Sequence, residues 1–308
     1  MNGGSRDLVV GVDGGGTKTD VIVADLDGDV VATARTGGTN HEMIGIERMI
    51  DTLDGVLSEA LASAGADRAD IAASVFGLAG VDWPSDVEMI DAAIGSLELG
   101  GPRWVLNDSQ IALRAGCARP WGIVSSVGTG SVTAGRNRDG RWFRTMAIGI
   151  GEPSGAGTIV RRALDAVAAH HHRTAGSTVL TNALPTALGM PDALAMFEAI
   201  SRGRTRGVRH LTPVVTDAAE GGDTVARKIV TEVAGQHAEM VVGVADRLDM
   251  LDDEFELVTA GGVHASGGLF REAFAEAIAT GCTAATIVPL TTTPALGAVS
   301  LALDLLGA

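Results

Sequence analysis

The apolar positions of residues 8–36 form three short runs that are separated by turns. Two runs rich in β-branched residues, 8–12 and 21–24, flank a segment with three consecutive glycines. β-branched residues favour strands, and glycines favour a tight turn between them because they accept positive φ without steric cost. A second turn at 27–28 lets 30–36 return along the second run. The pattern therefore predicts three consecutive antiparallel strands.

The next segments change to helical spacing and then alternate between helix and strand. Residues 46–64 carry apolar side chains on one helical face, and 74–78 and 103–106 are short apolar runs typical of buried strands. Helices are expected at 86–97 and 109–115. The predicted order is three strands followed by helix, strand, helix, strand and helix.

The second part of the chain repeats this order. Strands are expected at 123–127, 131–136, 141–148, 255–260 and 286–289, and helices at 269–279 and 295–306, with a helical insertion at about 154–250. The repeat lies in the order of elements and in a glycine-containing first turn, not in residue identity. We therefore expect an α/β fold with two domains of βββαβαβα order and a cleft between them. Residues 1–116 and 295–308 should form the N-terminal domain, and 117–294 the C-terminal domain.

Composition places the chain among globular proteins. Its 308 residues suit two domains with separate cores, and 46% of them are hydrophobic. No apolar run reaches the ~18 residues of a membrane span, and the first residues, MNGGSRD, lack the apolar segment of a signal peptide. We therefore expect a cytoplasmic protein without a membrane partner. The net charge of −15, with no basic block, argues against a nucleic-acid partner.

The turn after the first strand indicates a phosphate site. Asp13 ends that strand, and three glycines follow it. A turn without side chains exposes backbone N–H groups to an anion, and a carboxylate at the strand end can hold a hydrated Mg²⁺. A Walker A loop is rejected, because Thr17 stands where its Lys should be, Lys18 comes one place late, and a strand follows instead of a helix. The alternative is a hairpin without a ligand.

Seven short motifs distributed over nearly the whole chain carry a family resemblance. They are DGGGTKT at 13–19, TNH at 39–41, GLAGVD at 77–82, ND at 107–108, GTGS at 128–131, GGV at 261–263 and PALGA at 294–298. Together with the repeated element order, they resemble the sugar kinase, heat-shock chaperone and actin superfamily. More narrowly, the chain looks like the N-acetylglucosamine kinase branch, which is often grouped with BadF-type ATPases. This resemblance implies an actin-like ATPase fold, in which two ribonuclease H-like domains flank a cleft.

The resemblance also implies an ATP-dependent sugar kinase with ATP and Mg²⁺ as cofactors. Asp108 would be the catalytic base that accepts the proton of a sugar hydroxyl, and Asp13 would hold Mg²⁺ through water. The residues expected to bind ATP are Asp13, Gly14, Gly15, Gly16, Thr17, Lys18, Thr129, Gly130, Gly261 and Gly262. Those expected to bind the sugar are Asn40, Gly80, Asp108, Ser131 and Glu152.

Plainer interpretations compete at several of these positions. The segment around Asp108 could merely cap the following helix, and Asn40 could be a turn residue. Asp82 could line the sugar pocket or cap the helix expected at 86–97. The glycines around Thr129 could form an ordinary hairpin. His264, which follows the late glycine pair, could be a simple loop residue.

The chain departs from the family pattern around Glu152. Family members usually carry a GDEGS-like stretch preceded by Trp-Gly, whereas residues 151–156 read GEPSGA and the Trp is missing. Glu152 would then replace a sugar-binding aspartate with a carboxylate one methylene longer. The 6-hydroxyl of N-acetylglucosamine is the first candidate acceptor, and glucosamine, glucose or another amino sugar stays open.

A BadF-type ATPase that acts as a conformational switch without a sugar is the main alternative function. Such activators hold a bridging iron–sulfur cluster with cysteines. The two cysteines here, Cys117 and Cys282, are far apart and form no CxxC pair. A sugar kinase, expected to be a homodimer, therefore remains the preferred hypothesis.

Overall fold

The computed structural model describes residues 7–205, 208–266 and 268–307. The chain divides into two units. The first contains the residues up to 122 together with those from 288 onward, and the second contains 123–287. Each unit is built on its own five-stranded sheet, so the predicted α/β fold with a repeated unit is confirmed.

The unit boundaries lie a few residues from the positions 116/117 and 294/295 expected from the sequence. The segments just beyond those positions remain attached to the first unit. The Cys117 N–H donates to the Leu113 carbonyl at 3.0 Å, and the Thr292 hydroxyl donates to the Ala115 carbonyl at 3.1 Å. These bonds explain why the first unit extends to 122 and resumes at 288.

The sheet of the first unit has the strand order β3-β2-β1-β4-β5. Its strands are β1 (Leu8–Gly14), β2 (Lys18–Asp25), β3 (Val30–Gly37), β4 (Ile71–Leu78) and β5 (Arg103–Asn107). β1 pairs antiparallel with β2 and parallel with β4, and β4 pairs parallel with β5. The carboxyl ends of β1, β4 and β5 therefore share one edge of the sheet.

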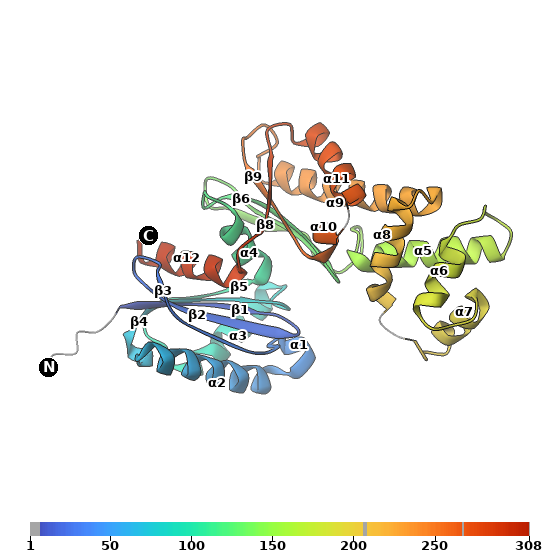
Figure 1. The fold of residues 1–308 in the computed structure, drawn as a ribbon. Coiled ribbons are helices and arrows are strands. Elements are labelled where there is room, and N and C mark those ends of the chain that lie inside the picture. Colours follow the sequence, from blue (N-terminus) through green and yellow to red (C-terminus); the bar gives the residue numbers. More distant parts are fainter. Residues whose placement is uncertain (1–6, 206–207, 267, 308) are drawn as a thin grey trace. The chain divides into compact units, whose positions relative to one another are not determined.

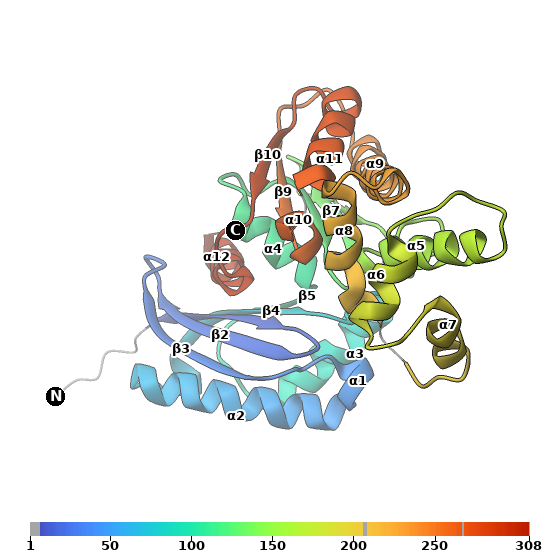
Figure 2. The ribbon, with the colours of Figure 1, turned by 45° about the vertical axis from the view of Figure 1, so that its right-hand side comes forward.

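Helices cover both faces of this sheet, which explains why its central strands are almost continuously apolar. The helices are α1 (His41–Ile44), α2 (Ile46–Ala64), α3 (Pro84–Ile94), α4 (Asp108–Gly116) and α12 (Pro294–Gly307), with 3₁₀ turns η1 (Arg68–Asp70) and η2 (Gly95–Leu97). Figures 1 and 2 show α2 along one face and α12 along the other. Successive β1 residues alternate between two cores: Val10 packs in the core that contains Met49 of α2, and Val9 packs in the core that contains Ala298 of α12.

The helix α12 approaches β1 very closely at Gly11. A Cβ atom at Gly11 would lie 2.6 Å from both the Ala295 carbonyl oxygen and the Val299 nitrogen. A Cβ atom at Gly297 would lie 2.0 Å from the Ile111 carbonyl oxygen of α4. Both positions require glycine because backbone atoms of the neighbouring element occupy the space of a side chain.

The second sheet repeats the arrangement of the first. Its order is β10-β9-β6-β7-β8, with β6 (Gly122–Val127), β7 (Ser131–Arg136), β8 (Trp142–Arg144), β9 (Glu256–Ala260) and β10 (Thr286–Pro289). Written from the opposite edge, the order is β8-β7-β6-β9-β10. It matches β3-β2-β1-β4-β5 of the first sheet strand for strand. The similarity of the two sheets confirms the predicted duplication.

The third strand expected in the second part, at 141–148, is much shorter than predicted. β8 ends at Arg144, and bends follow it. Alternating apolar residues at 146, 148 and 150 imitate a strand, yet their side chains are 48–70% exposed. Ala147, Gly149 and Gly151 have φ of 62°, 70° and 72°. These left-handed conformations interrupt the extended backbone that a strand needs.

The insertion expected at about 154–250 is helical. It contains α5 (Ala156–His171), α6 (Leu180–Ala187), α7 (Ala193–Ser201), η3 (Val208–Leu211), α8 (Thr212–Glu220) and α9 (Thr224–Arg247). The second unit also contains α10 (Gly262–Ser266) and α11 (Gly268–Gly281). Within the described part of the chain, no helix combines the length and apolar character that crossing a membrane requires.

Candidate functional site

The carboxyl-end edge of the first sheet brings together the residues predicted for catalysis in this unit. The register pairs Asp13 with Gly77, and Gly77 with Leu106. Asp108 follows two residues later, at the first position of α4. Asp13 and Asp108 therefore lie near each other, close enough that the charge of Asp108 raises the pKa of Asp13.

Close backbone packing builds the β1–β2 turn. None of Gly14, Gly15 and Gly16 has φ in the left-handed region, so the expectation of positive φ here is wrong. Glycine is required for space, since a Cβ at Gly14 would lie 2.4 Å from the Thr39 hydroxyl oxygen. The Thr39 N–H donates to the Gly15 carbonyl at 2.9 Å, and the Ala79 N–H donates to the Gly14 carbonyl at 2.8 Å. Two adjacent loops therefore fix the turn in place.

Asp13 carries a poorly compensated carboxylate. Its pKa is raised from 3.8 to about 6, mainly by burial and then by the charge of Asp108, while Lys18 lowers it. A bound divalent cation would offset this charge. Among the described residues, no three His, Cys, Asp or Glu side chains could hold a metal ion together. A Mg²⁺ ion at Asp13 would therefore keep water or phosphate ligands, which suits its chemistry.

Thr17 and Lys18 lie on the exposed side of the turn. The Lys18 ammonium is 2.8 Å from Asp20 Oδ2, and Asp20 also pairs with Arg35. Burial raises the pKa of Asp20, but hydrogen bonds from Arg35 and Lys18 outweigh it and lower that pKa overall. Lys18 thus already pairs with the Asp20 carboxylate. To bind a phosphate, the Lys18 ammonium would either contact both groups or leave Asp20.

The helix that begins at Asp108 is capped by its neighbours. Asn107 Oδ1 accepts from the Ser109 N–H at 3.1 Å and from the Ser109 hydroxyl at 2.5 Å. Gln110 Oε1 accepts in turn from the Asn107 N–H at 3.1 Å. This reciprocal arrangement is a capping box. The capping role considered for the segment is carried by Asn107 and Gln110, so the helix does not depend on the Asp108 carboxylate for it.

Asn107 also holds the loop that follows β4. Its Nδ2 donates to Asp82 Oδ1 at 3.0 Å and to the Val81 carbonyl at 3.2 Å. The interpretation of Asp82 as a helix cap is wrong. The N-cap position of α3 is Trp83, and Asp86 accepts from the N–H groups of both Asp82 and Trp83. The sequence showed Asn107 only as a capping residue, so its link to Asp82 was missed.

Asn40 and Gly80, both predicted to bind the sugar, lie against each other. Gly80 has φ of 88°, and a Cβ there would lie 3.0–3.2 Å from the Asn40 amide group. Asn40 Oδ1 accepts from the Glu42 N–H at 2.9 Å and so caps α1. The amide Nδ2 makes no hydrogen bond to any described residue, so Asn40 is a turn residue with a donor left for a ligand.

In the second unit, the turn at 128–130 is held on two sides. A Cβ at Gly155, just before α5, would lie 2.3 Å from a carbonyl oxygen of the turn. A Cβ at Gly261 would lie 2.5 Å from the carbonyl oxygen that precedes the turn. Gly261 has φ of 92° and is exposed, as are Thr129 and Gly262. The two glycine segments predicted to bind ATP in this unit are therefore neighbours.

Ser131 and Glu152, both predicted to bind the sugar, stabilise the loop between β8 and α5. The Ser131 hydroxyl donates to the Pro153 carbonyl at 2.5 Å. Glu152 Oε1 accepts from the N–H groups of Ile148 and Gly149 at 2.8 and 3.3 Å. Its second carboxylate oxygen accepts no hydrogen bond from the described residues. Glu152 can therefore hold the loop with one oxygen and a ligand with the other.

His264 is a buried residue and not the loop residue considered from the sequence. Its side chain is 5% exposed, and its ring packs edge-on against Phe270 and Phe274. His264 Nε2 lies 3.2 Å from the Ser125 hydroxyl of β6. Burial, and then the charge of Arg271, lower its pKa to about 4. A neutral His264 thus links the segment after Gly261 to β6, the strand that leads into the 128–130 turn. No local sequence pattern indicates this contact.

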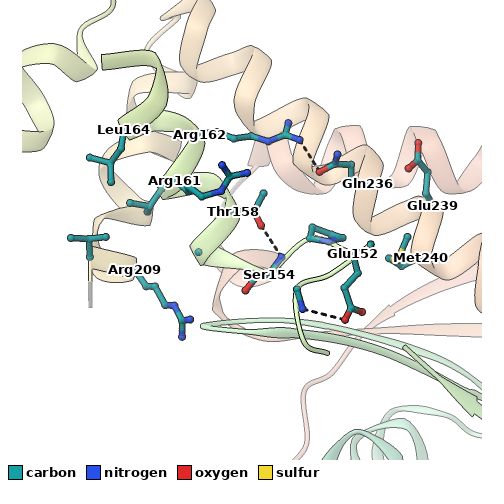
Figure 3. Close-up of a pocket in the computed structure, with 16 residues that line it drawn as sticks. Glu152, Ser154, Thr158, Arg161, Arg162, Leu164, Arg209, Gln236, Glu239 and Met240 are labelled. Atoms are coloured by element: carbon teal, nitrogen blue, oxygen red, sulfur yellow. Dashed lines mark hydrogen bonds between the residues drawn. The ribbon is translucent and has the colours of Figure 1, made fainter. Parts of the chain in front are cut away.

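A cavity of about 690 Å³ opens beside Glu152 within the second unit. It is lined by residues of the loop and first turns of α5 (149–164), by Val208 and Arg209, and by α9 residues between 236 and 240. Figure 3 shows Arg161 and Arg209 on one side of this cavity and Glu239 with Met240 on the other. No local sequence pattern indicates this cavity, because its walls come from three separate segments.

Comparisons with known proteins relate this chain to proteins that are named as sugar kinases. A Clostridium acetobutylicum protein named N-acetylmuramic acid/N-acetylglucosamine kinase is 31% identical over 259 residues, covering 83% of this chain and 85% of the relative. A Dictyostelium discoideum protein named N-acetyl-D-glucosamine kinase is 24% identical over 315 residues, covering 97% and 99%. The crystal structure of a candidate N-acetylglucosamine kinase from Chromobacterium violaceum superposes with a TM-score of 0.73 at 24% identity, covering 97% of this chain and 99% of the other.

The repeated sheet order and this structural similarity define the class by its fold, an α/β protein of two units that each contain a five-stranded sheet. The family can be stated more closely. The chain belongs to the BadF/BadG/BcrA/BcrD ATPase family, which it matches over residues 10–302. The resemblance drawn from the sequence motifs is thereby confirmed.

Proposed function

We propose that this protein is an ATP-dependent sugar kinase that phosphorylates the 6-hydroxyl of N-acetylglucosamine or glucosamine. The observation that carries the proposal is the position of Asp108, at the carboxyl-end edge of the first sheet and near Asp13. Asn107 and Gln110 cap the helix that begins at Asp108, and the proposal assigns the Asp108 carboxylate to the sugar hydroxyl. The two relatives described above are both named as kinases of N-acetylglucosamine.

The nucleotide is bound by the glycine-containing turns and their flanking residues. In the first unit, the Gly16 N–H and the Thr17 hydroxyl bind phosphate oxygens, with Gly14 and Gly15 beside them, since the Gly15 N–H already donates to the Lys18 carbonyl at 2.9 Å. Asp13 would hold Mg²⁺ through water, and the ion would offset the charge of the phosphates. In the second unit, Thr129 and Gly130 bind phosphate, and the exposed Gly261–Gly262 segment leaves room for the adenosine.

Asp108 activates the acceptor. Its carboxylate takes the proton of the sugar hydroxyl as the oxygen attacks the γ-phosphorus. The bond between that phosphorus and the oxygen bridging to the β-phosphate breaks, which yields ADP, the sugar phosphate and one proton. Asn40 Nδ2 and the free oxygen of Glu152 orient the sugar, with Gly80 and Ser131 in the pocket wall. Correct alignment supplies much of the rate in such transfers.

A sugar panel with coupled detection of ADP tests the proposal. We expect ADP release to depend on an amino sugar or hexose, and Asp108→Asn to lower kcat by roughly two orders of magnitude or more while ATP binding is retained. The matched control is Asp51→Asn, because Asp51 is an exposed residue of α2 that is not among the proposed site residues. ATP hydrolysis that no sugar stimulates would overturn the kinase assignment. An unchanged rate in the Asp108 variant would remove that residue from its role.

Sugar-independent hydrolysis would instead favour the conformational switch suggested by the family name. Such a switch with a bridging iron–sulfur cluster would need accessible cysteines, whereas Cys117 and Cys282 are 5% and 1% exposed. We further propose a homodimer with a cytoplasmic location. Sedimentation velocity tests the dimer, and fractionation of cells tests the location.

A further inference from the structure

Four charged residues lie together on one face of the first sheet, next to the β1–β2 turn. The strand register places Asp20 of β2 directly opposite Asp13 of β1 on one side and Arg35 of β3 on the other. Directly opposed residues point to the same face, with Cβ atoms roughly 5 Å apart. Lys18 and Ile22, two residues before and after Asp20, share that face. Ile22 packs in the core below α12, so the four charges lie on the face that α12 covers further along the strands.

Asp20 holds the two cations with separate oxygens. Lys18 Nζ donates to Asp20 Oδ2 at 2.8 Å, and Arg35 Nε donates to Asp20 Oδ1. The Asp20 side chain is 11% exposed, whereas those of Lys18 and Arg35 are 54% and 67% exposed. The carboxylate is therefore the buried member of the cluster. Either cation can leave it while the other still compensates its charge.

The two cations differ in what they can reach. Lys18 is the first residue of β2 and directly follows Thr17, whose hydroxyl is proposed to bind phosphate. Arg35 lies on β3, which is separated from β1 by β2. A lysine ammonium is a compact charge on a flexible stem, whereas a guanidinium is suited to a fixed carboxylate partner. Lys18 is therefore the cation that can move to a phosphate, and Arg35 is the one that stays.

Departure of Lys18 would be unfavourable if Arg35 were absent. A carboxylate that is largely removed from water and then loses its counter-ion is strongly destabilised. The Asp13 carboxylate on the neighbouring strand would add repulsion, since the charges of Asp13 and Asp20 already interact. A bound nucleotide would bring further negative charge to the same place. Arg35 reduces this penalty, because it keeps Asp20 Oδ1 when Oδ2 is released.

We propose that Arg35 is a positioning residue for the nucleotide: it holds Asp20 and thereby lets Lys18 exchange that carboxylate for a phosphate oxygen of ATP. Arg35 itself does not contact the nucleotide. The inference rests on the proposed function in that it places a phosphate near Lys18, and it does not depend on the acceptor. Without nucleotide, Lys18 and Arg35 share Asp20. With nucleotide, Arg35 alone compensates it.

Calorimetric titration with ATP and Mg²⁺ measures this exchange. Lys18→Gln should weaken ATP binding by about tenfold, as expected for a charge-assisted hydrogen bond. Arg35→Gln should weaken it by about threefold to fivefold, the upper range for partly exposed ion pairs, and Arg35→Lys should restore most of the affinity. In an Asp20→Asn background, Arg35→Gln should have no effect, because no carboxylate then needs compensation. The matched control is Arg48→Gln, which should bind ATP as the wild type does, since Arg48 is an exposed residue of α2 on the other face of the sheet.

Steady-state kinetics give a second measurement that a merely structural role would not affect. Arg35→Gln should raise the KM for ATP while kcat and the KM for the sugar stay nearly the same. If Arg35 only joined β2 to β3, the variant would have a lower urea midpoint with an unchanged affinity for ATP, and the inference would be overturned. An equal loss of affinity with and without Asp20→Asn would also overturn it, because the effect of Arg35 would then not act through Asp20. Unchanged ATP binding in Lys18→Gln would do the same.

The outcomes separate this inference from the proposed function. If the variants give the expected affinities for ATP but no sugar accelerates ADP release, the exchange at Asp20 stands and the kinase assignment fails. If a sugar is phosphorylated and the effect of Arg35→Gln does not depend on Asp20, the exchange fails alone. A wild-type protein that does not bind ATP would overturn both.

Discussion

Replacing Asp13 by Asn should raise the stability of the first unit and lower the activity of the protein. The pKa of Asp13 is raised from 3.8 to about 6, mainly by burial and then by Asp108. A rise of that size corresponds to about 3 kcal/mol of free energy between the two protonation states. Asp13 is partly exposed, so solvent screens part of this cost. We therefore expect Asp13→Asn to stabilise the ligand-free first unit by about 1–2 kcal/mol at pH 7.

The pH dependence of this gain follows from linkage. The folded state takes up the Asp13 proton near pH 6 and the unfolded state near 3.8. Between these values the folded state binds more protons, so the wild-type unit gains stability as the pH falls through 6. Asn cannot ionise, and the advantage of the variant should therefore shrink below pH 6 and vanish near pH 4.

Tryptophan fluorescence can follow the first unit by itself. Trp83, Trp104 and Trp121 belong to that unit, and Trp142 belongs to the second. In a Trp142→Phe background, urea unfolding at pH 7, 6 and 5 reports the first unit alone. A variant no more stable than wild type at pH 7, or an advantage independent of pH, would refute the reasoning. Turnover should fall by roughly two orders of magnitude in the same variant, because the proposed Mg²⁺ loses its anchor.

Three further changes test other parts of the structure. Asn107→Ala should lower the free energy of unfolding by about 1–2 kcal/mol and should also lower kcat. Asn107→Ser should restore the stability, because serine can still cap α4, but it should not restore kcat. Urea unfolding measures the first effect and turnover measures the second. Gly11→Ala should destabilise the first unit by about 2 kcal/mol or more, because its Cβ meets the α12 backbone at 2.6 Å; an unchanged midpoint in urea would contradict this packing. The His237 side chain is 1% exposed, and its Nε2 makes no hydrogen bond within the described part of the chain. Burial, and then the charge of His264, lower its pKa to about 3. The second unit should therefore lose stability as the pH falls below 6.5. His237→Phe should slow hydrogen exchange in α9 more at pH 5 than at pH 7.5, and an equal effect at both values would exclude titration of this histidine as the cause.

The sequence predicted the first unit well because both local signals and periodicity agreed there. The helix at 46–64 has the bounds expected from its apolar stripe. The strand expected to end at Asp13 ends one residue later, at Gly14, and the strand expected at 103–106 ends at Asn107. Parallel pairing then brings the neighbouring Asp108 to the same edge. The prediction failed at 141–148, where alternating apolar residues resembled a strand but left-handed backbone interrupts it.

Contacts between distant segments could not be predicted. The bond of His264 to Ser125 joins residues 139 positions apart, and the Asn107–Asp82 bond joins residues 25 apart. Each side chain has a common local explanation, a loop or a cap, and only the fold provides the partner. The arginines of the cavity show the same limit, since Arg161 and Arg209 come from different helical segments of the insertion.

The packing of α12 on β1 has a consequence for biosynthesis. The first unit contains the residues up to 122 and from 288 onward, whereas the second is one continuous stretch. During translation, the face of β1 and β4 that α12 covers has no partner until residues 294–307 leave the ribosome. The second unit has all of its segments earlier and can fold first. A nascent chain stalled before residue 294 would therefore expose the apolar residues Val9, Ile22 and Val75, which would make it a substrate for chaperones or a source of aggregates.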